Sequence, residues 1–221
     1  MDANPRDEPE RCCFDDWVDH WAVNARKRPT AAKLTERLLD ALDAAGLRDR
    51  TVLDLGCGIG DLAIGTLARG ATTARGYDLS PKAIDEARRL ASERGVASRS
   101  AFEIGDAAKL ELPQADVVVL NRVFCCYPDA TGLLERSLAA AGSVYAYTIP
   151  RSTGLIAPWI RVWNVAWNVV YRVRRSKYAG FRTYIHDVEQ VDATVRARGF
   201  RPVRREVRRV VWDVAVYAKA A

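Results

Sequence analysis

The ten residues TVLDLGCGIG, at positions 51–60, carry the signal that decides the fold. Their first half, Thr51–Leu55, is short and apolar, as in a buried strand, and a helix is expected to begin directly after them at Asp61. Glycines at such a junction have no Cβ atom, so the backbone can approach a ligand closely, and the helix start presents unpaired N–H groups. The loop therefore predicts a site for a dinucleotide or another adenosine-containing cofactor.

The spacing of the glycines narrows the choice of ligand. Gly56, Gly58 and Gly60 follow the pattern Gly-x-Gly-x-Gly. Asp61 stands where the dinucleotide-binding fingerprint Gly-x-Gly-x-x-Gly has its last glycine. This departure argues against a dinucleotide.

Outward from this loop, strand and helix patterns alternate along the chain. Short apolar runs predict strands, and runs with helical periodicity predict helices. Such alternation means parallel β-α-β units with right-handed crossovers and helices on both faces of the sheet. The expected strands are Thr51–Leu55, Ala74–Asp78, Ser100–Ile104, Asp116–Leu120 and Ser143–Ile149, and the expected helices are Asp61–Arg69, Ser80–Arg94, Ala130–Ala140 and Asp187–Arg198.

The C-terminal stretch, Arg201–Ala218, alternates charged and apolar residues. It should form two further strands that turn near Arg208 or Arg209. The expected fold class is therefore α/β, with a Rossmann-like, doubly wound, seven-stranded and mostly parallel sheet whose C-terminal strand is antiparallel.

The length of 221 residues is enough for one α/β domain and too short for two independent cores. Residues 1–13 are polar and contain prolines, which predicts a disordered N-terminus. Residues 14–221 are expected to form a single domain. Residues 150–186 break the alternation and should form an amphipathic helical insert.

Residues 14–46 are expected to form two N-terminal helices, and the family resemblance described below implies that they act as a lid. The first is Phe14–Ala25, with apolar residues on one face, and the second is capped by Thr30 and ends near Gly46.

The composition, 49% hydrophobic and 28% charged, is that of an ordinary soluble protein. No uncharged apolar run of about 18 residues predicts a transmembrane helix, and the N-terminus does not read as a signal peptide. The five cysteines form no Cys-x-x-Cys pair, so neither a disulfide framework nor a metal site is expected. Free thiols favour a reducing, cytoplasmic location.

Polar residues follow the next three expected strands at the edge where open α/β folds bind ligands. Asp78 ends the second strand, and its carboxylate can accept hydrogen bonds from two ribose hydroxyls. Asp106 follows the third strand and could accept from an adenine amino group. Asn121 follows the fourth strand and is the last of these candidate cofactor contacts.

Taken together, these motifs resemble those of class I S-adenosylmethionine-dependent methyltransferases. The matching pieces are VLDLGCGIG at 52–60, GYDLS at 76–80 and GDA at 105–107. The resemblance covers roughly residues 50–150 and implies S-adenosylmethionine as cofactor, released as S-adenosylhomocysteine. It implies that the amino-acid end is held by Asp54 and the loop, that the ribose is bound by Asp78, and that the adenine meets Leu79, Asp106 and Ala107. The full expected cofactor set is Asp54, Gly56, Cys57, Gly58, Gly60, Asp78, Leu79, Asp106, Ala107 and Asn121.

A weaker resemblance points to the magnesium-protoporphyrin O-methyltransferase branch. It rests on Cys125-Cys126-Tyr127-Pro128 and on Arg182-Thr183-Tyr184-Ile185-His186. That branch typically has a histidine before its Tyr-Pro pair, where this chain has Cys126.

Three residues are candidates for the acceptor side. A general base is needed only if the acceptor does not ionise easily, and the chain has two histidines, His20 and His186. Either histidine could instead cap or orient a loop. Tyr127, at the mouth of the fourth strand, is a candidate substrate contact or a core residue.

The insert has two unlike faces in helical projection. Arg161, Asn164, Asn168, Arg172 and Arg175 share a polar face, and tryptophans at 159, 163 and 167 lie on the apolar one. The helix could pack over the active-site edge, could cover a lipophilic acceptor as a lid, or could touch a membrane surface through residues 155–175.

The net charge of +6 is unevenly placed, because residues 151–186 contain seven bases and no acid. Such a stretch can be a solvated face or can meet a membrane, an anionic substrate or a nucleic acid. Residues 121–124 lack the prolines that follow the fourth strand in enzymes methylating nucleic-acid bases, and no nucleic-acid partner is expected.

The sequence thus predicts a methyltransferase for a lipophilic or aromatic small molecule, with transfer to oxygen by in-line displacement. The alternatives are an RNA methyltransferase that uses residues 151–186 and a non-catalytic cofactor-binding protein.

Overall fold

A computed structural model describes residues 12–27, 33–174, 181–208 and 211–219. The expected cap at Thr30 and residues 1–11 of the expected disordered N-terminus lie outside the described residues, whereas Cys12 and Cys13 form a turn before the first helix. The helices are α1 (Asp15–Arg26), α2 (Lys33–Ala44), α3 (Asp61–Ala68), α4 (Pro81–Glu93), α5 (Ala130–Ala140), α6 (Ala157–Val173) and α8 (Val188–Ala197).

Seven strands form one sheet with the order β3-β2-β1-β4-β5-β7-β6. β1 to β5 run parallel to one another, and β7 runs antiparallel to both β5 and β6. This confirms the predicted fold class. The strands are β1 (Thr51–Leu55), β2 (Thr73–Asp78), β3 (Ser100–Ile104), β4 (Ala115–Asn121), β5 (Ala141–Pro150), β6 (Phe200–Arg208) and β7 (Trp212–Lys219).

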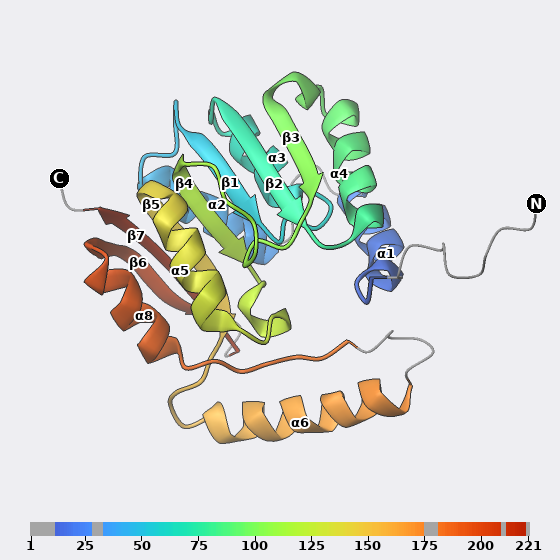
Figure 1. The fold of residues 1–221 in the computed structure, drawn as a ribbon, viewed down its shortest axis with the longest axis vertical. Coiled ribbons are helices and arrows are strands. Elements are labelled where there is room, and N and C mark those ends of the chain that lie inside the picture. The colour runs from blue at the N-terminus through green and yellow to red at the C-terminus, as the bar shows by residue number, and fades with distance from the viewer. Residues whose placement is uncertain (1–11, 28–32, 175–180, 209–210, 220–221) are drawn as a thin grey trace, which may run out of the picture.

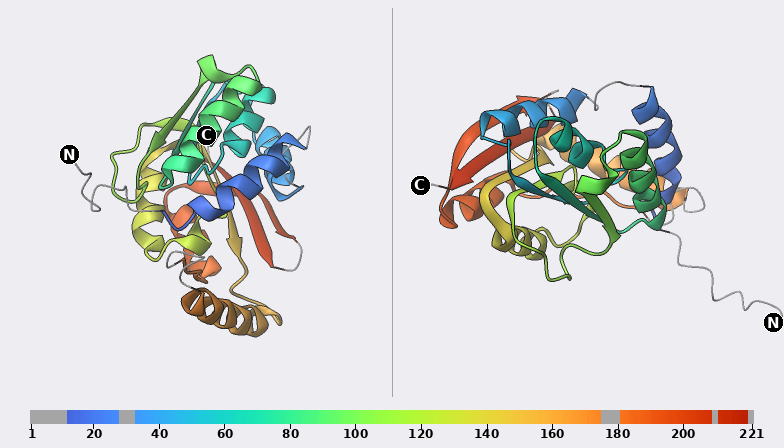
Figure 2. Two further views of the ribbon diagram at one scale, coloured as in Figure 1. Left: turned by 90° about the vertical axis from the view of Figure 1, so that its right-hand side faces the viewer. Right: turned by 90° about the horizontal axis from the view of Figure 1, so that it is seen from above.

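Helices cover both faces of the sheet (Figures 1 and 2). Successive strand side chains point to opposite faces, so Val117 and Val119 pack with α2, α3 and α4, whereas Val118 and Leu120 pack with α5 and α8. Each face therefore has its own buried apolar layer, as a doubly wound sheet requires.

The N-terminal helix α1 is fixed to α4 by ion pairs and lies over the edge of the sheet beyond β2. Arg26 pairs with Glu86 at 2.6 Å, and Lys82 pairs with Asp19 at 2.8 Å. At the start of α1, Asp15 accepts a hydrogen bond from Ser80, which caps α4 directly after β2. These contacts place the start of α1 beside the carboxyl end of β2, and the role of α1 as a lid stays a prediction.

The insert forms the helix α6, which lies at the edge of the domain (Figure 1). Ala157 is the buried residue of this helix, and the tryptophans Trp159 and Trp163 are 73% and 67% exposed. Of the three alternatives for this helix, a lid with its tryptophan face over the acceptor does not match the exposure of Trp159 and Trp163. The asparagines of the polar face turn inward instead, because Asn164 and Asn168 find hydrogen-bond partners there.

Candidate functional site

The candidate site lies at the carboxyl ends of β1 to β4. The sheet order reverses direction around β1 and β4, since β1 leads to β2 on one side and β4 leads to β5 on the other. Ligands of open α/β sheets bind in the crevice at such a switch point. The loop after β1, residues 56–60, lies at this point.

The loop needs its glycines for two reasons. Gly56, Gly58 and Gly60 have φ angles of 69°, 54° and 76°, in the left-handed region that side chains rarely adopt. A Cβ atom at Gly56 would lie 2.6 Å from a methyl group of Val123, and one at Gly60 would lie 2.8 Å from the ring of Phe102. At these two positions the loop packs directly on its neighbours.

Gly58 differs from the other two glycines because its side is open. The nearest side-chain atom to a Cβ built there belongs to Trp21 of α1, at 3.9 Å. The middle of the loop therefore offers a cradle into which a ligand can approach the backbone closely.

Cys57 contributes its backbone to the loop. Its N–H and that of Gly56 both donate to the carbonyl of Tyr77, at 3.0 and 2.8 Å. Its side chain is buried, and a Cβ atom at Gly76 would lie 2.7 Å from its sulfur. Burial raises the pKa of the Cys57 thiol, so the thiol is a packing group at neutral pH.

Asp78 ties the end of β2 to the glycine loop. One carboxylate oxygen accepts from the N–H of Gly58 at 2.8 Å, and the other accepts from the N–H of Ser80 at 2.9 Å. Burial raises the pKa of Asp78, and these amide bonds oppose that shift. Each oxygen can accept a further hydrogen bond, which suits two adjacent ribose hydroxyls.

Asp54 is a buried acid that accepts no hydrogen bond from the described residues. It is 1% exposed, and neither oxygen has a hydrogen-bond partner among the described residues. Burial raises the pKa of Asp54 to about 8, although the nearby amide of Ala63 acts in the opposite direction. A buried carboxylate normally has a partner, so an ammonium group arriving at the loop would fit here.

Asp106 and Tyr127 form a pair across the site. The phenol of Tyr127 donates to the two carboxylate oxygens of Asp106 at 2.9 and 3.0 Å. Lys109 and the N–H of Ala108 also contact this carboxylate, at 3.1 and 3.0 Å. Burial, and then the bond to Asp106, raise the pKa of Tyr127 to about 12, so its phenol remains a donor at neutral pH.

Leu79 and Ala107, two residues predicted to contact adenine, lie next to Asp78 and Asp106 in the chain. Leu79 is 42% exposed directly after Asp78, and Ala107 is buried next to Asp106. An exposed leucine beside a polar site is a suitable platform for a flat ring.

Asn121 holds the end of β4 to its neighbours. Its amide donates to Thr35 of α2 at 3.2 Å, and its carbonyl accepts from Thr148 of β5 at 2.9 Å. Arg122 follows with a φ of 62°, which is unusual for a residue with a side chain, and its N–H donates to Thr148 at 2.7 Å. Asn121 therefore positions the strained turn at the mouth of the site.

His186 also has a positioning contact. Its Nε2 lies 2.9 Å from the carbonyl oxygen of Tyr127, and its ring stacks on that of Tyr184. The N–H of Tyr184 donates to the carbonyl of Cys125 at 2.7 Å. The segment before α8 thus holds the loop that carries Tyr127.

His20 lies on the exposed side of α1, where its Nε2 is 2.9 Å from the amide nitrogen of Asn24. The same helix turns Trp21 toward Gly58. The role of His20 as a general base therefore stays a prediction from the sequence.

Four aromatic rings cluster beside helix α1. Phe181 packs edge-on against Phe14 and Tyr171 with centroid distances of 5.5 and 5.0 Å, and Trp17 lies 6.5 Å from it. The cluster joins α1, α6 and the segment after residue 180. It supplies an apolar surface next to the start of α1.

Sequence reasoning missed several residues of the site. Thr35, Thr148 and Arg122 carry no motif, because their roles follow from contacts between segments far apart in the chain. Trp21 had a signal, since it lies on the apolar face of a helix expected to cover the cofactor. The role of Trp21 depends on the orientation of that helix relative to the glycine loop.

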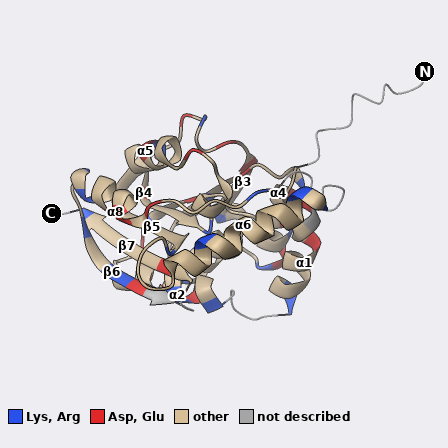
Figure 3. Cartoon of the chain, turned by 90° about the horizontal axis from the view of Figure 1, so that it is seen from below, with Lys and Arg blue, Asp and Glu red and all other residues tan. Residues whose placement is uncertain are grey.

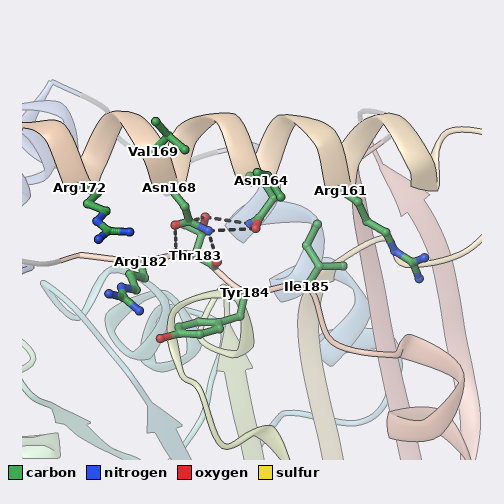
Figure 4. Close-up of a pocket in the computed structure, with 10 residues that line it drawn as sticks. Arg161, Asn164, Asn168, Val169, Arg172, Arg182, Thr183, Tyr184 and Ile185 are labelled. Atoms are coloured by element: carbon green, nitrogen blue, oxygen red, sulfur yellow. Dashed lines mark hydrogen bonds between the residues drawn. The ribbon is translucent and has the colours of Figure 1, made fainter.

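An open hollow lies apart from the glycine loop, between α6 and the segment 182–185 (Figure 4). Its volume is about 560 Å³. Three guanidinium groups, from Arg161, Arg172 and Arg182, contribute to its lining, together with Asn164, Asn168 and Thr183. Apolar side chains, among them Val165, Val169 and Ile185, complete the lining. The hollow is therefore basic and partly apolar, and it is a feature separate from the candidate cofactor site.

Exchange of Tyr127 for Phe tests the pairing with Asp106. We expect Tyr127→Phe to weaken binding of S-adenosylhomocysteine by roughly threefold to tenfold, because a charge-assisted hydrogen bond that positions Asp106 is lost. Tyr184→Phe is the matched control, since Tyr184 packs on the same loop. Titration calorimetry gives both affinities. Equal affinity of Tyr127→Phe and the unaltered protein would exclude this role.

Comparison with known proteins supplies an independent view of the same region. A family model described as a methyltransferase domain matches residues 52–141. The chain is 40% identical over 112 residues to the ribosomal protein L11 methyltransferase of Haemophilus influenzae. That match covers 48% of this chain and 38% of the relative, so the chain spans well under half of the length of that relative.

Two solved structures share the fold along nearly the whole chain. Magnesium protoporphyrin IX methyltransferase from Synechocystis, solved with S-adenosylhomocysteine, superposes with a TM-score of 0.67 at 19% identity, covering 100% of this chain and 90% of that one. An O-methyltransferase family 2 protein from Planctomyces limnophilus, in complex with apigenin, gives a TM-score of 0.67 at 16% identity, covering 93% and 62%.

Proposed function

We propose that this chain is a class I S-adenosylmethionine-dependent methyltransferase that methylates a lipophilic or aromatic small molecule at oxygen. The match of a methyltransferase family model to residues 52–141 supports the proposal, as does the sequence resemblance. The observation that carries the proposal is the arrangement of three carboxylates around the open glycine loop. Asp54, Asp78 and Asp106 belong to or follow three adjacent strands of the sheet.

The residues present fit this cofactor. Asp54 is a buried carboxylate without a described hydrogen-bond partner, which suits the ammonium group of the amino-acid end. Asp78 has spare acceptor capacity for the ribose hydroxyls, and the open side of Gly58 gives close access to the backbone. Asp106, held by Tyr127, would accept from the adenine amino group, and Leu79 and Ala107 would contact the ring.

When bound, S-adenosylmethionine supplies a methyl group attached to a positively charged sulfur. This sulfur becomes a neutral thioether once the methyl group is transferred. The chain has to align the acceptor and exclude water, and proximity supplies much of the rate in such a transfer. Tyr127 is a protonated phenol that donates its proton to Asp106, so toward an acceptor it offers only its oxygen and its ring. His186 acts as a positioning residue, because it holds the backbone of Tyr127.

The choice of acceptor rests on the aromatic cluster of Phe14, Trp17, Tyr171 and Phe181. Such a surface suits a flat or greasy acceptor better than a peptide or an RNA strand. Of two structures with the same fold, one is named a magnesium protoporphyrin IX methyltransferase, and the other is an O-methyltransferase solved in complex with apigenin. Transfer to oxygen is proposed because residues 121–124 lack the prolines found in enzymes for nucleic-acid bases.

A protein acceptor is the second candidate. The observation that favours it is the 40% identity over 112 residues to ribosomal protein L11 methyltransferases. The match covers 38% of that relative, so much of the relative lies outside the compared segment.

Incubation of the full chain with methyl-labelled S-adenosylmethionine and a cell extract distinguishes these acceptors. We expect the label in the organic fraction, where mass spectrometry identifies the product and the methylated atom. Label in protein would favour the second candidate, and label in RNA would favour use of the basic segment 151–186. Bound cofactor with no transfer to any fraction would make the chain a non-catalytic binding protein. Asp78→Ala serves as the control for background labelling.

A further inference from the structure

One face of α6 is apolar, continuous and turned away from the domain. Trp159 and Trp163 are 73% and 67% exposed, and Val162 and Val169 are 61% and 56% exposed. These residues recur at intervals of three and four, so they share a stripe along the helix. The outward stripe consists of Pro158, Trp159, Val162, Trp163, Ala166, Val169 and Val173.

Hydrogen bonds fix this orientation from the inner side (Figure 4). The amide group of Asn168 accepts from the N–H of Thr183 at 2.9 Å and donates to its carbonyl at 2.8 Å. Asn164 donates to the hydroxyl of Thr183 at 2.8 Å. The asparagines of α6 are therefore satisfied against the domain, and the tryptophans are held outward.

Bases border the apolar stripe along one flank of α6. The hollow between α6 and residues 182–185 is lined by Arg161, Arg172 and Arg182, next to Val165 and Val169. All three arginines are exposed, and residues 151–186 contain no acid. Guanidinium groups at the edge of an apolar helix face suit lipid phosphates above an acyl layer.

We propose that α6 docks this protein on a membrane that contains anionic phospholipids, with its outward stripe at the level of the headgroup–acyl boundary. Arg161, Arg172 and Arg182 then contact lipid phosphates along the flank of the helix. In the described part of the chain, no helix is long and apolar enough to cross a bilayer, so α6 lies in the plane of the surface. This surface is separate from the proposed cofactor site.

A second copy of the chain suits this face less well. A symmetric contact places the same patch on both sides, so the bases of one α6 would meet the bases of the other with no acid in residues 151–186 to pair with them. An anionic lipid surface matches the same charges. Figure 3 shows α6 crossing the underside of the domain, where it can meet an extended surface.

The proposed membrane face also lies close to the acceptor side of the candidate site. Tyr171 of α6 contacts Phe181, and the same segment reaches the loop of Tyr127 through the bond of His186. A lipophilic acceptor could therefore reach the site from the bilayer.

Vesicle flotation of the full chain tests the membrane proposal. We expect flotation with vesicles of phosphatidylcholine mixed with phosphatidylglycerol and weaker flotation with phosphatidylcholine alone. The variant Val162→Gln/Val169→Gln should bind the mixed vesicles at least about tenfold less well, because two exposed isopropyl groups no longer enter the acyl region. Val203→Gln, on the exposed side of β6 and 46% exposed in the unaltered protein, is the matched control and should bind normally.

Three results would overturn the membrane proposal. One is the absence of flotation by a protein whose circular dichroism and melting are those of a folded chain. Another is flotation that Val162→Gln/Val169→Gln leaves unchanged. The third is a dimer, seen by sedimentation without vesicles, that the same double variant converts to a monomer. None of these results depends on methyl transfer or on cofactor binding.

Discussion

Replacement of Asp78 by Ala is expected to lower the affinity for S-adenosylhomocysteine by about a hundredfold. Two charge-assisted hydrogen bonds to ribose hydroxyls are worth about 1.5 kcal/mol each at the low end of their range, and each 1.4 kcal/mol is about tenfold in affinity. Titration calorimetry of the full chain measures the change. Unchanged affinity would remove the ribose assignment.

The same substitution also loosens the glycine loop, since Asp78 holds the N–H groups of Gly58 and Ser80. A ligand change separates the two effects. The unaltered protein should prefer S-adenosylhomocysteine to its analogue without the 2′-hydroxyl, whereas Asp78→Ala should bind both equally. A purely structural role of Asp78 predicts the same preference in both proteins. Asp85→Ala, an exposed acid on α4, controls for loss of charge.

Replacement of Asp54 by Asn should stabilise the cofactor-free protein and weaken cofactor binding. The pKa of Asp54 is about 8 in the folded chain and near its ordinary value of 3.8 in the unfolded chain. The folded state therefore holds more protons between these values, and the stability of the unaltered protein falls as the pH rises from about 4 to 8. The Asn side chain is neutral at every pH. The stability that Asp54→Asn gains over the unaltered protein should therefore be absent near pH 4 and greatest near pH 8.

Thermal melting measures the stability of the cofactor-free protein, and we expect the melting temperature of Asp54→Asn at pH 8 to exceed that of the unaltered protein by at least about 3 °C. Titration calorimetry measures the weaker binding of the cofactor. An ammonium group arriving beside Asp54 favours its ionised form, so binding of S-adenosylmethionine at pH 6–7 should release a proton in the unaltered protein and none from this position in Asp54→Asn. Comparison of two buffers with different ionisation heats gives the proton count. A variant that melts lower at pH 8, or that binds with the same proton release, contradicts the assignment.

The sheet and the three carboxylates were predictable because they depend on local patterns. An apolar run followed by glycine or a capping residue marks the end of a strand, and parallel strands present these ends at one edge. Asp78 could be placed beside the loop from strand periodicity alone. The predicted strand Ser143–Ile149 is longer in the structure, Ala141–Pro150, because pairing with β4 and β7 extends it at both ends.

The orientation of α6 could not be read from its periodicity. An amphipathic pattern fixes which side chains share a face, and the usual assumption turns the apolar face inward. Here the inner neighbour is the segment around Thr183, which offers a hydroxyl and backbone groups. The asparagines satisfy these groups, and the tryptophans are left outside.

The roles of the histidines depend on contacts between distant segments. His186 reaches the carbonyl of Tyr127, 59 positions earlier in the chain. No spacing rule connects such residues, because their distance is set by the way the segment before α8 crosses the end of β4. The placement of the Asn121 amide between Thr35 and Thr148 has the same origin.

A crystal structure of the full chain with S-adenosylhomocysteine tests the central claim most directly. The account predicts the ligand across the carboxyl ends of β1 to β3, with its ribose hydroxyls on the Asp78 carboxylate, its amino group beside Asp54 and its adenine between Leu79 and Asp106. Ligand density at another place, or a ribose that does not meet Asp78, would contradict the account.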